Sequence, residues 1–400
     1  MLSTRFSFGQ TARAAVLAFA ALALAGCQLA PPTTQVAGPP GPAVDPAQPV
    51  RVALLVPTGG GDPVAEEIGR SIVNAARLAQ ADAQGVNLDL NIYETGGTAS
   101  GGVEAARRAV DEGAQIVLGP VFSPETAGAG AITRGAGLSM LSFNNNPENA
   151  DPGVYLLGLS FDNSADRVVS YAVSRGLRNV AVVYPEGIQG ATARRAVASA
   201  AQRAGASVVS QQGYDLSVRG IERASGPIAT NLRNAGANAV VLADAPTGGL
   251  GYISEGLRDQ GITPLQAQFL GIHRWELSPE VLNQPSLQGA WFAAPDPGPV
   301  SAFEGRYRNA YGQRPHELAA LGYDGVAAVA ALVRRAQVQG GRAPFAPANV
   351  VAPEGFDGVY GAFRLMPNGM SQRNLAVREV RDGAAPVIDR APRAFVGLVN

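Results

Sequence analysis

The chain has 400 residues, of which 46% are hydrophobic and 6% aromatic, and its formal charge at neutral pH is −1. This length exceeds one ordinary hydrophobic core, so two domains or lobes are expected. The near-zero charge excludes the basic footprint that nucleic-acid binding requires.

The first residues resemble the export signal of a bacterial lipoprotein. Two arginines precede an apolar run, residues 14–25, that is too short to span a bilayer. Leu24-Ala25-Gly26-Cys27 matches the lipobox, which implies removal of residues 1–26 and acylation of Cys27 as a membrane anchor. Gln28 follows where an Asp would indicate inner-membrane retention, so the resemblance implies the periplasmic face of the outer membrane. The alternative is an ordinary signal peptide with a chance cysteine.

Residues 27–49 are expected to hold the lipidated Cys27 and a proline-rich spacer. Seven prolines fall between residues 28 and 49, with almost no apolar periodicity. A polyproline ligand for a partner is the alternative.

The folded part is expected to begin with a buried strand, residues 52–56. A glycine loop, residues 59–61, precedes Asp62, which is expected to cap a helix that starts at Pro63. The loop could cradle a phosphate, but acidic residues already occupy the positive end of this helix, so a turn and cap are favoured. A half-exposed strand (residues 88–92) and a helix (residues 103–110) follow.

Residues 115–148 are expected to form one wall of a cleft. A strand at 116–118 leads to the polar loop of Ser123 and Thr126, and a second strand, 138–143, ends in three asparagines, Asn144 to Asn146. Ligands of open α/β sheets bind outside the carboxyl ends of such strands.

The same strand and helix pattern then repeats. Apolar strands are predicted at 180–184, 239–243 and 269–271, separated by helices. The repetition predicts a doubly wound, mostly parallel α/β sheet in each of two lobes, with a cleft between them.

The C-terminal third is expected to return to the first lobe. After a strand at 289–293, three prolines between 295 and 299 indicate a hinge crossing. Helices are predicted at 300–311 and 317–337, followed by a hairpin of residues 359–365 and 375–380 around Asn368-Gly369.

The order of four motifs resembles type 1 periplasmic binding proteins of the Leu/Ile/Val-binding group. These motifs are Gly119-Pro120-Val121-Phe122-Ser123, Asn144-Asn145-Asn146-Pro147-Glu148, Ala319-Ala320-Leu321-Gly322-Tyr323-Asp324-Gly325 and Phe356-Asp357-Gly358-Val359-Tyr360-Gly361. The resemblance implies two α/β lobes joined by three crossings. Lobe 1 would comprise residues 50–161 and 298–350, and lobe 2 residues 162–297 and 351–390.

The resemblance also implies where ligand contacts lie. An amino-acid ligand needs hydroxyls or amides for its carboxylate and an acid for its ammonium. Where that acid is expected, the chain reads Leu270-Gly271-Ile272-His273-Arg274-Trp275, with Glu276 as the nearest acid, so a simple α-amino acid fits poorly. The cleft candidates are Ser123, Thr126, Asn144, Asn145, Tyr184, Gln189, Asp244, Arg274 and Asp324.

Catalysis, cofactors and metals are not expected. Ser123 has no nucleophile-elbow motif around it, and His273 and His316 are far apart with no ligand-spaced partners. Asp324 could line the cleft or start a helical turn at the lobe interface, and Asp162 is favoured as a hinge cap.

Two non-enzymatic functions fit these features. The first, favoured by the lipobox and the spacer, is a lipoprotein activator of a penicillin-binding protein, that is, of a peptidoglycan synthase. The alternative is the substrate-binding component of an ABC transporter for amino acids or related amides, with an ABC permease as its partner.

Overall fold

The computed structural model describes Met1 and residues 41–395, and residues 41–395 belong to one compact unit. Cys27, the signal segment and most of the spacer lie outside the described residues, so export and anchoring stay predictions. The packed part begins earlier than residue 50. Val44 is buried, and its amide donates to the carbonyl of Arg342 at 2.7 Å.

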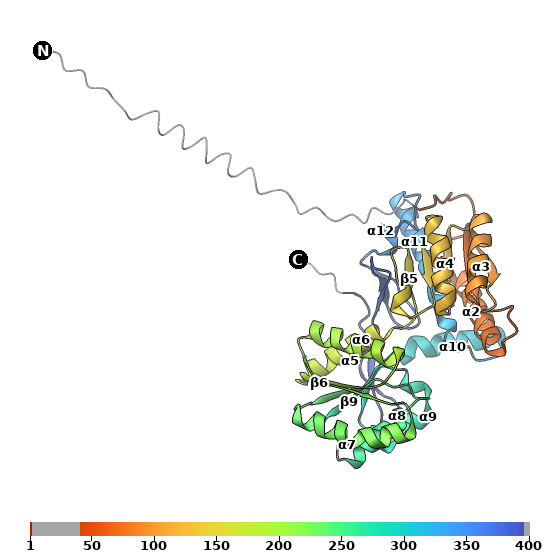
Figure 1. The fold of residues 1–400 in the computed structure, drawn as a ribbon. Helices are drawn as coiled ribbons and strands as arrows, with labels where there is room; N and C mark the ends of the chain where they lie inside the picture. The colour runs from red at the N-terminus through yellow and green to blue at the C-terminus, as the bar shows by residue number, and fades with distance from the viewer. Residues whose placement is uncertain (2–40, 396–400) are drawn as a thin grey trace. The chain divides into compact units, whose positions relative to one another are not determined.

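The sheet of lobe 1 has five parallel strands in the order β2-β1-β3-β4-β5. It is flanked by helices on both faces (Figure 1). The strands are β1 (Val50–Val56), β2 (Leu88–Glu94), β3 (Ile116–Leu118), β4 (Met140–Ser142) and β5 (Val154–Leu156). The helices are α2 (Pro63–Asp82), α3 (Ala99–Asp111), α4 (Ser123–Gly135), α10 (Pro297–Tyr311), α11 (Ala319–Gln339) and the short α12 (Pro347–Val350).

Strand β1 shows why this sheet forms from a continuous apolar run. Val52, Leu54 and Val56 pack with α2 and α11 on one face, whereas Ala53 and Leu55 pack with α3 and α4 on the other. Successive side chains of a strand point to opposite faces, so both faces must be apolar when both are covered.

Helices α2 and α11 approach closely because α11 carries a glycine at the contact. A Cβ on Gly322 would lie 2.6 Å from the carbonyl oxygen of Ile72 in α2. The absence of a side chain at this position lets the two helices pack together.

The sheet of lobe 2 has seven strands in the order β14-β13-β10-β9-β8-β6-β7. Strands β6 to β10 are parallel, β13 pairs antiparallel with β10, and β14 pairs antiparallel with β13. The strands are β6 (Asn179–Pro185), β7 (Ser207–Tyr214), β8 (Ala239–Leu242), β9 (Gln268–Gly271), β10 (Trp291–Ala294), β13 (Ala376–Glu379) and β14 (Val387–Asp389).

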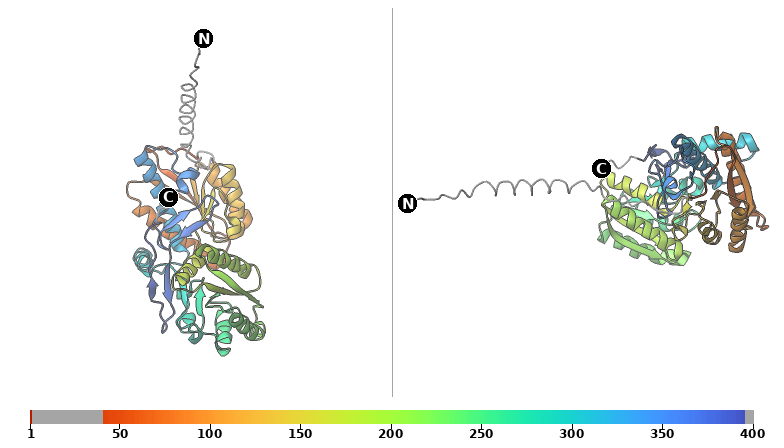
Figure 2. Two further views of the ribbon diagram at one scale, coloured as in Figure 1. Left: turned by 90° about the vertical axis from the view of Figure 1, so that its left-hand side faces the viewer. Right: turned by 90° about the horizontal axis from the view of Figure 1, so that it is seen from above.

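Helices cover both faces of this second sheet as well. Helices α5 (Phe161–Ser174) and α6 (Ile188–Ala204) pack on Val180 and Val182. Helices α7 (Val218–Asn234) and α8 (Leu250–Asp259) pack on Ala181 and Val183. The short α9 (Pro279–Leu282) follows β9. The predicted α/β class, with two lobes of mostly parallel sheet, is confirmed (Figure 2). Among the described residues, no helix combines the length and apolar character needed to cross a membrane.

The predicted boundary at residue 350 is wrong. Phe356, Val359, Tyr360 and Phe363 are buried in the lobe 1 core, although the prediction assigned them to lobe 2. Leu375 is the first of the later residues to pack in the lobe 2 core, beside α5 and β9. The third crossing therefore lies near Asn374, because the apolar side chains that precede it pack in the lobe 1 core together with those of α11.

The second strand of the predicted hairpin is also wrong. Its turn at Asn368-Gly369 is correct, but β11 (Phe363–Leu365) pairs with β12 (Ser371–Arg373), not with residues 375–380. Gly369 has a φ of 83°, and a Cβ there would lie 2.4 Å from the amide of Asp151. The turn thus packs against lobe 1, and residues after 374 join the lobe 2 sheet as β13.

A buried ion pair joins the crossing segments. Arg373 donates to the carboxylate of Asp324 in α11 at 2.9 Å, and both side chains are fully buried. The same guanidinium donates to the carbonyls of Leu157 at 3.1 Å and Gly361 at 3.2 Å. The second carboxylate oxygen of Asp324 accepts from the amide of Val359 at 2.7 Å. One pair thereby connects the first crossing, α11 and the third crossing.

Replacing one partner of this pair should be strongly destabilising. We expect Arg373→Met to lower the free energy of unfolding by about 3–5 kcal/mol, because it leaves the Asp324 carboxylate buried without its counter-charge. Urea denaturation measures this. Arg381→Met is the matched control, since Arg381 pairs with Glu379 at the surface and should contribute no more than about 1 kcal/mol. Equal effects of the two substitutions would contradict the role of the buried pair.

Candidate functional site

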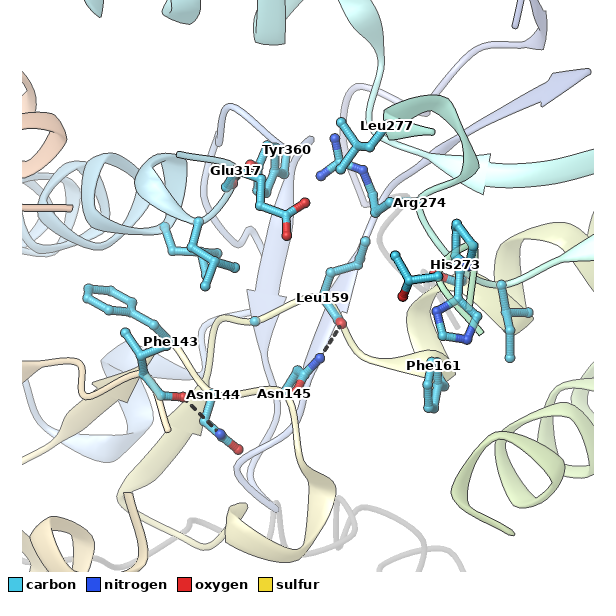
Figure 3. A pocket seen from close by; sticks show the side chains of 18 of the residues that line it. Phe143, Asn144, Asn145, Leu159, Phe161, His273, Arg274, Leu277, Glu317 and Tyr360 are labelled. Carbon is cyan, nitrogen blue, oxygen red and sulfur yellow. Dashed lines mark hydrogen bonds between the residues drawn. The ribbon is translucent and has the colours of Figure 1, made fainter. Parts of the chain in front are cut away.

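A cleft of about 580 Å³ lies between the two lobes. Lobe 1 contributes the loop before α4, the end of β4, the start of α11 and Tyr360. Lobe 2 contributes the loops after β8 and β9, and the first crossing forms the floor near Leu159 (Figure 3). The cleft thus lies at the carboxyl ends of strands in both sheets, as expected for parallel α/β lobes.

The structure brings four of the nine predicted residues to this cleft: Ser123, Asn144, Asn145 and Arg274. The other five are not among its lining residues. Whether any of the nine contacts a ligand stays a prediction.

The asparagines of lobe 1 bond mainly to their own loop. Asn144 accepts from the amide of Asn146 at 2.8 Å and from Asn149 Nδ2 at 3.1 Å, and it donates to the carbonyl of Val121 at 2.9 Å. Ser123 Oγ accepts from Asn146 Nδ2 at 3.0 Å and from Asn149 Nδ2 at 2.6 Å. Ser123 and Asn144 therefore fix the shape of the wall, and sequence analysis missed Asn149 as their common partner.

Asn145 differs from its neighbours because its side chain is exposed. Its Nδ2 donates to the carbonyl of Leu159 on the first crossing at 3.3 Å (Figure 3). This bond is long for N–H···O geometry, so the amide is available to a ligand.

Thr126 lies beneath the wall. It is buried, donates to the carbonyl of Phe122 at 3.0 Å and lies 3.0 Å from the hydroxyl of Ser142. Beside it, buried Glu125 accepts from the amide of Phe122 at 3.0 Å and from the hydroxyl of Thr95. Burial raises the pKa of Glu125, against the effect of these two donors. Both residues position the start of α4.

Asp244 shapes the loop after β8 from below. Its carboxylate accepts from the hydroxyl of Tyr214 at 2.6 Å and from the amides of Ala245 and Gly249, each at 2.7 Å. Burial, together with this carboxylate, raises the pKa of Tyr214 well above its ordinary value. Thr247, in the loop that Asp244 holds, lines the cleft instead of Asp244 itself.

Tyr184, Gln189 and Asp324 also lie away from the cleft lining. Tyr184 packs against the α6 side of lobe 2, with the guanidinium of Arg194 5.9 Å from its ring. Gln189 is exposed in the first turn of α6. Asp324 is consumed by its pair with Arg373, which is the interface role that sequence analysis left open.

Arg274 is the cation of the cleft. Its Nε pairs with Glu276, and its guanidinium lies 5.0 Å from the ring centre of Tyr360. The side chain is 20% exposed and that of Glu276 is 9% exposed. Burial acts to lower the pKa of Arg274, but Glu276 and Tyr360 outweigh it and the pKa is raised. Glu276 engages Nε, and the guanidinium also interacts with Tyr360, so a ligand at the Nη end would share it with Tyr360.

His273 lies beside Arg274 and is neutral near pH 7. Its ring meets that of Phe161 edge-on, with 5.0 Å between the centroids. Burial lowers the pKa of His273 to about 4, and Asp244 opposes this only in part. The imidazole can therefore donate or accept a hydrogen bond in the cleft but brings no charge.

Glu317 and Tyr360 are lining residues that sequence analysis did not name as candidates. The Tyr360 hydroxyl donates to the backbone carbonyl of Glu317, and Glu317 is exposed and turns its carboxylate into the cleft (Figure 3). Tyr360 belongs to one of the four motifs, so that motif could have indicated it. Within residues 41–395, no cluster of three or more His, Cys, Asp or Glu side chains could hold a metal ion.

Comparison with solved structures supports the fold. A protein from Rhodospirillum rubrum, assigned to a branched-chain amino acid ABC transporter, is 22% identical, with 85% of this chain and 100% of that chain covered and a TM-score of 0.72. A substrate-binding protein from Desulfitobacterium hafniense in complex with Leu is 19% identical, with coverage of 85% and 100% and a TM-score of 0.62.

A third structure is a solute-binding protein from R. palustris in complex with 4-hydroxybenzoate. It is 16% identical, with 88% of this chain and 100% of that chain covered and a TM-score of 0.58. At these identities the likeness establishes the fold alone. A search of curated proteins gave no significant match.

The family model described as "Periplasmic binding protein" matches residues 49–385, which include every strand of both lobes except β14, all three crossings and every residue of the cleft lining. The chain therefore belongs to the periplasmic binding protein family.

Proposed function

We propose that this protein is the substrate-binding component of an ABC transporter and captures a small organic molecule in its cleft. The observation that carries this proposal is the cleft itself. Its volume of about 580 Å³ falls within the usual range for small-molecule sites, and residues of both lobes line it. The solved relatives from ABC transporters, which include complexes with Leu and 4-hydroxybenzoate, add support.

The lining is suited to binding rather than to catalysis. Aromatic and aliphatic side chains form most of the walls, and a few polar groups, among them Asn145, His273 and Arg274, converge on the space between them. Ser123 and Asn144 are engaged in the loop network, so they position the wall and contribute less to the ligand.

The test is a screen of the mature chain by calorimetry with amino acids, amides and organic acids that include leucine and 4-hydroxybenzoate. We expect one ligand per chain. A bound ligand at one hundred times its dissociation constant should stabilise the fold by about 2.7 kcal/mol. Thr247→Trp should lower the affinity at least tenfold because the indole would occupy the cleft. Thr230→Trp, at an exposed position of α7, is the control. Failure of every compound in the screen would count against the proposal.

The affinity should be nearly independent of pH between 5.5 and 8.0. The pKa of His273 is lowered to about 4, so this residue stays neutral throughout the interval and gains no charge that could attract or repel a ligand. We expect less than a twofold change, measured by calorimetry with any ligand that does not itself titrate in this interval. The contrary result would be an affinity for an anion that rises several-fold as the pH falls to 5.5. If His273→Gln abolished that rise, His273 would be shown to become cationic.

A second function is favoured by one sequence observation. Leu24-Ala25-Gly26-Cys27 followed by Gln28 is typical of an outer-membrane lipoprotein, and such an anchor suits an activator of a peptidoglycan synthase. A pull-down of the lipidated protein from membranes should then recover a penicillin-binding protein. Addition of the protein to that synthase should raise its rate of glycan polymerisation. If Thr247→Trp abolishes small-molecule binding but leaves this activation intact, the two functions use different surfaces.

A further inference from the structure

We propose that the cleft selects a carboxylate with an apolar body and without a neighbouring ammonium group, and that the carboxylate binds the Nη end of Arg274. This inference rests on the proposed function and names its class of ligand.

The first step is the position of the positive charge. Arg274 is largely buried, projects from lobe 2 into the cleft and is held by Glu276 through Nε (Figure 3). Glu276 also acts on Arg378: burial lowers the pKa of Arg378, and Glu276 opposes this. Glu276 forms its ion pair with Arg274 and acts on Arg378 only at longer range, so the two positive charges together outnumber this one negative charge. A guanidinium binds a carboxylate through two parallel N–H groups, which the two Nη atoms can provide.

The second step is that, among the described residues, no buried carboxylate around the cleft is available to an ammonium group. Both oxygens of Asp244 already accept hydrogen bonds, from Tyr214 and two amides, and Asp324 is paired with Arg373. Glu276 Oε2 has no hydrogen-bond partner among the described residues, but it is shielded from solvent and Glu276 does not line the cleft. The buried acids around the cleft therefore offer nothing to an α-ammonium group.

Glu317 is the remaining acid, and it opposes an anion rather than completing an amino-acid site. It lines the cleft but is exposed, so water screens its charge. The ammonium of an α-amino acid is bonded to the same carbon as the carboxylate. A carboxylate on Arg274 would therefore bring the ammonium close to the buried guanidinium, which repels it.

The third step is the shape and polarity of the walls. The remaining lining is dominated by apolar side chains from both lobes, among them Phe122, Phe143, Phe161, Ile272, Leu318 and Leu321. Burial of an apolar body against them provides affinity, while the single cation fixes the orientation of the ligand. Neutral His273, next to Arg274, can bond a hydroxyl but adds no second cation.

The experiment uses ligands that differ by one group. Calorimetry on the mature chain compares leucine with 4-methylpentanoate, which lacks the ammonium, and with 3-methylbutylamine, which lacks the carboxylate. A second pair is 4-hydroxybenzoate and its neutral amide, 4-hydroxybenzamide. We expect 4-methylpentanoate to bind at least tenfold more tightly than leucine or 3-methylbutylamine. We expect 4-hydroxybenzoate to bind at least tenfold more tightly than 4-hydroxybenzamide. Affinity for leucine equal to or above that for 4-methylpentanoate would overturn the inference.

Three variants distinguish the role of Arg274 from that of Glu317. Arg274→Met should weaken carboxylate binding at least thirtyfold. Because it strands Glu276, the double variant Arg274→Gln, Glu276→Gln is measured beside it and should show the same loss. Glu317→Gln should strengthen carboxylate binding, since it removes an opposing charge. Loss of binding in Glu317→Gln would instead identify Glu317 as an ammonium acceptor and overturn the inference.

The outcomes also separate this inference from the proposed function. Tight binding of leucine, the amine or the amide alone would overturn the carboxylate class and leave the transporter function standing. Failure of every compound in the wider screen would remove both.

Discussion

The buried pair of Asp324 and Arg373 is the constraint on which the rest of the structure depends. Arg373 lies at the third crossing, donates to Leu157 at the first crossing and pairs with a carboxylate in α11. Leu159 and Tyr360, two residues of the cleft, lie next to these contacts in the chain. A charge in a dry interior has few acceptable positions, so the pair fixes how the crossing segments meet and thereby fixes the floor of the cleft.

The two walls of the cleft differ in the polar groups that they offer to a ligand. In lobe 1 the polar side chains of Ser123, Asn144 and Asn149 satisfy one another, which makes a rigid wall with little polar capacity left for a ligand. In lobe 2 the loop after β9 presents Arg274, whose Nε is held by Glu276 and whose guanidinium lies against Tyr360. Lobe 2 therefore supplies the positive charge of the cleft, whereas lobe 1 supplies its shape together with the exposed amide of Asn145 and the carboxylate of Glu317.

Much of the fold could be predicted because it depends on local patterns. The apolar run of β1, the cap at Asp62 and the Asn368-Gly369 turn each follow from a few adjacent residues. The partner of β11 could not be predicted in this way, because residues 371–373 and 376–379 are both acceptable strands. The choice between them is made by tertiary packing, since the turn docks on Asp151 and Leu375 enters the core of lobe 2.

The site shows the same limit. Its strand-end position was predictable from the sheet pattern, and so were Asn145 and Arg274 as lining residues. The hydrogen bond that Asn149 donates to Asn144 was not predictable, because a hydrogen-bond network depends on the path of the loop rather than on residue type. Asp244 and Asp324 were predicted to be ligand-binding residues because their side-chain contacts cannot be deduced from the sequence either. A carboxylate at the end of a strand can face the cleft or hold the loop from below, and its sequence position does not distinguish the two.

The loop after β9 explains why Arg274 can act as a fixed recognition group. Trp275 is fully buried, its ring packs 5.6 Å from that of Phe292, and a Cβ on Gly271 would lie 2.5 Å from the indole. Gly271 thus leaves room for Trp275, and the buried Trp275 anchors the backbone directly after Arg274. Because the backbone is held on one side and the guanidinium by Glu276 on the other, little side-chain freedom remains to be lost on binding. An arginine prepared in this way attracts an anion at a low entropic cost, and it disfavours a ligand that carries a positive charge beside its carboxylate.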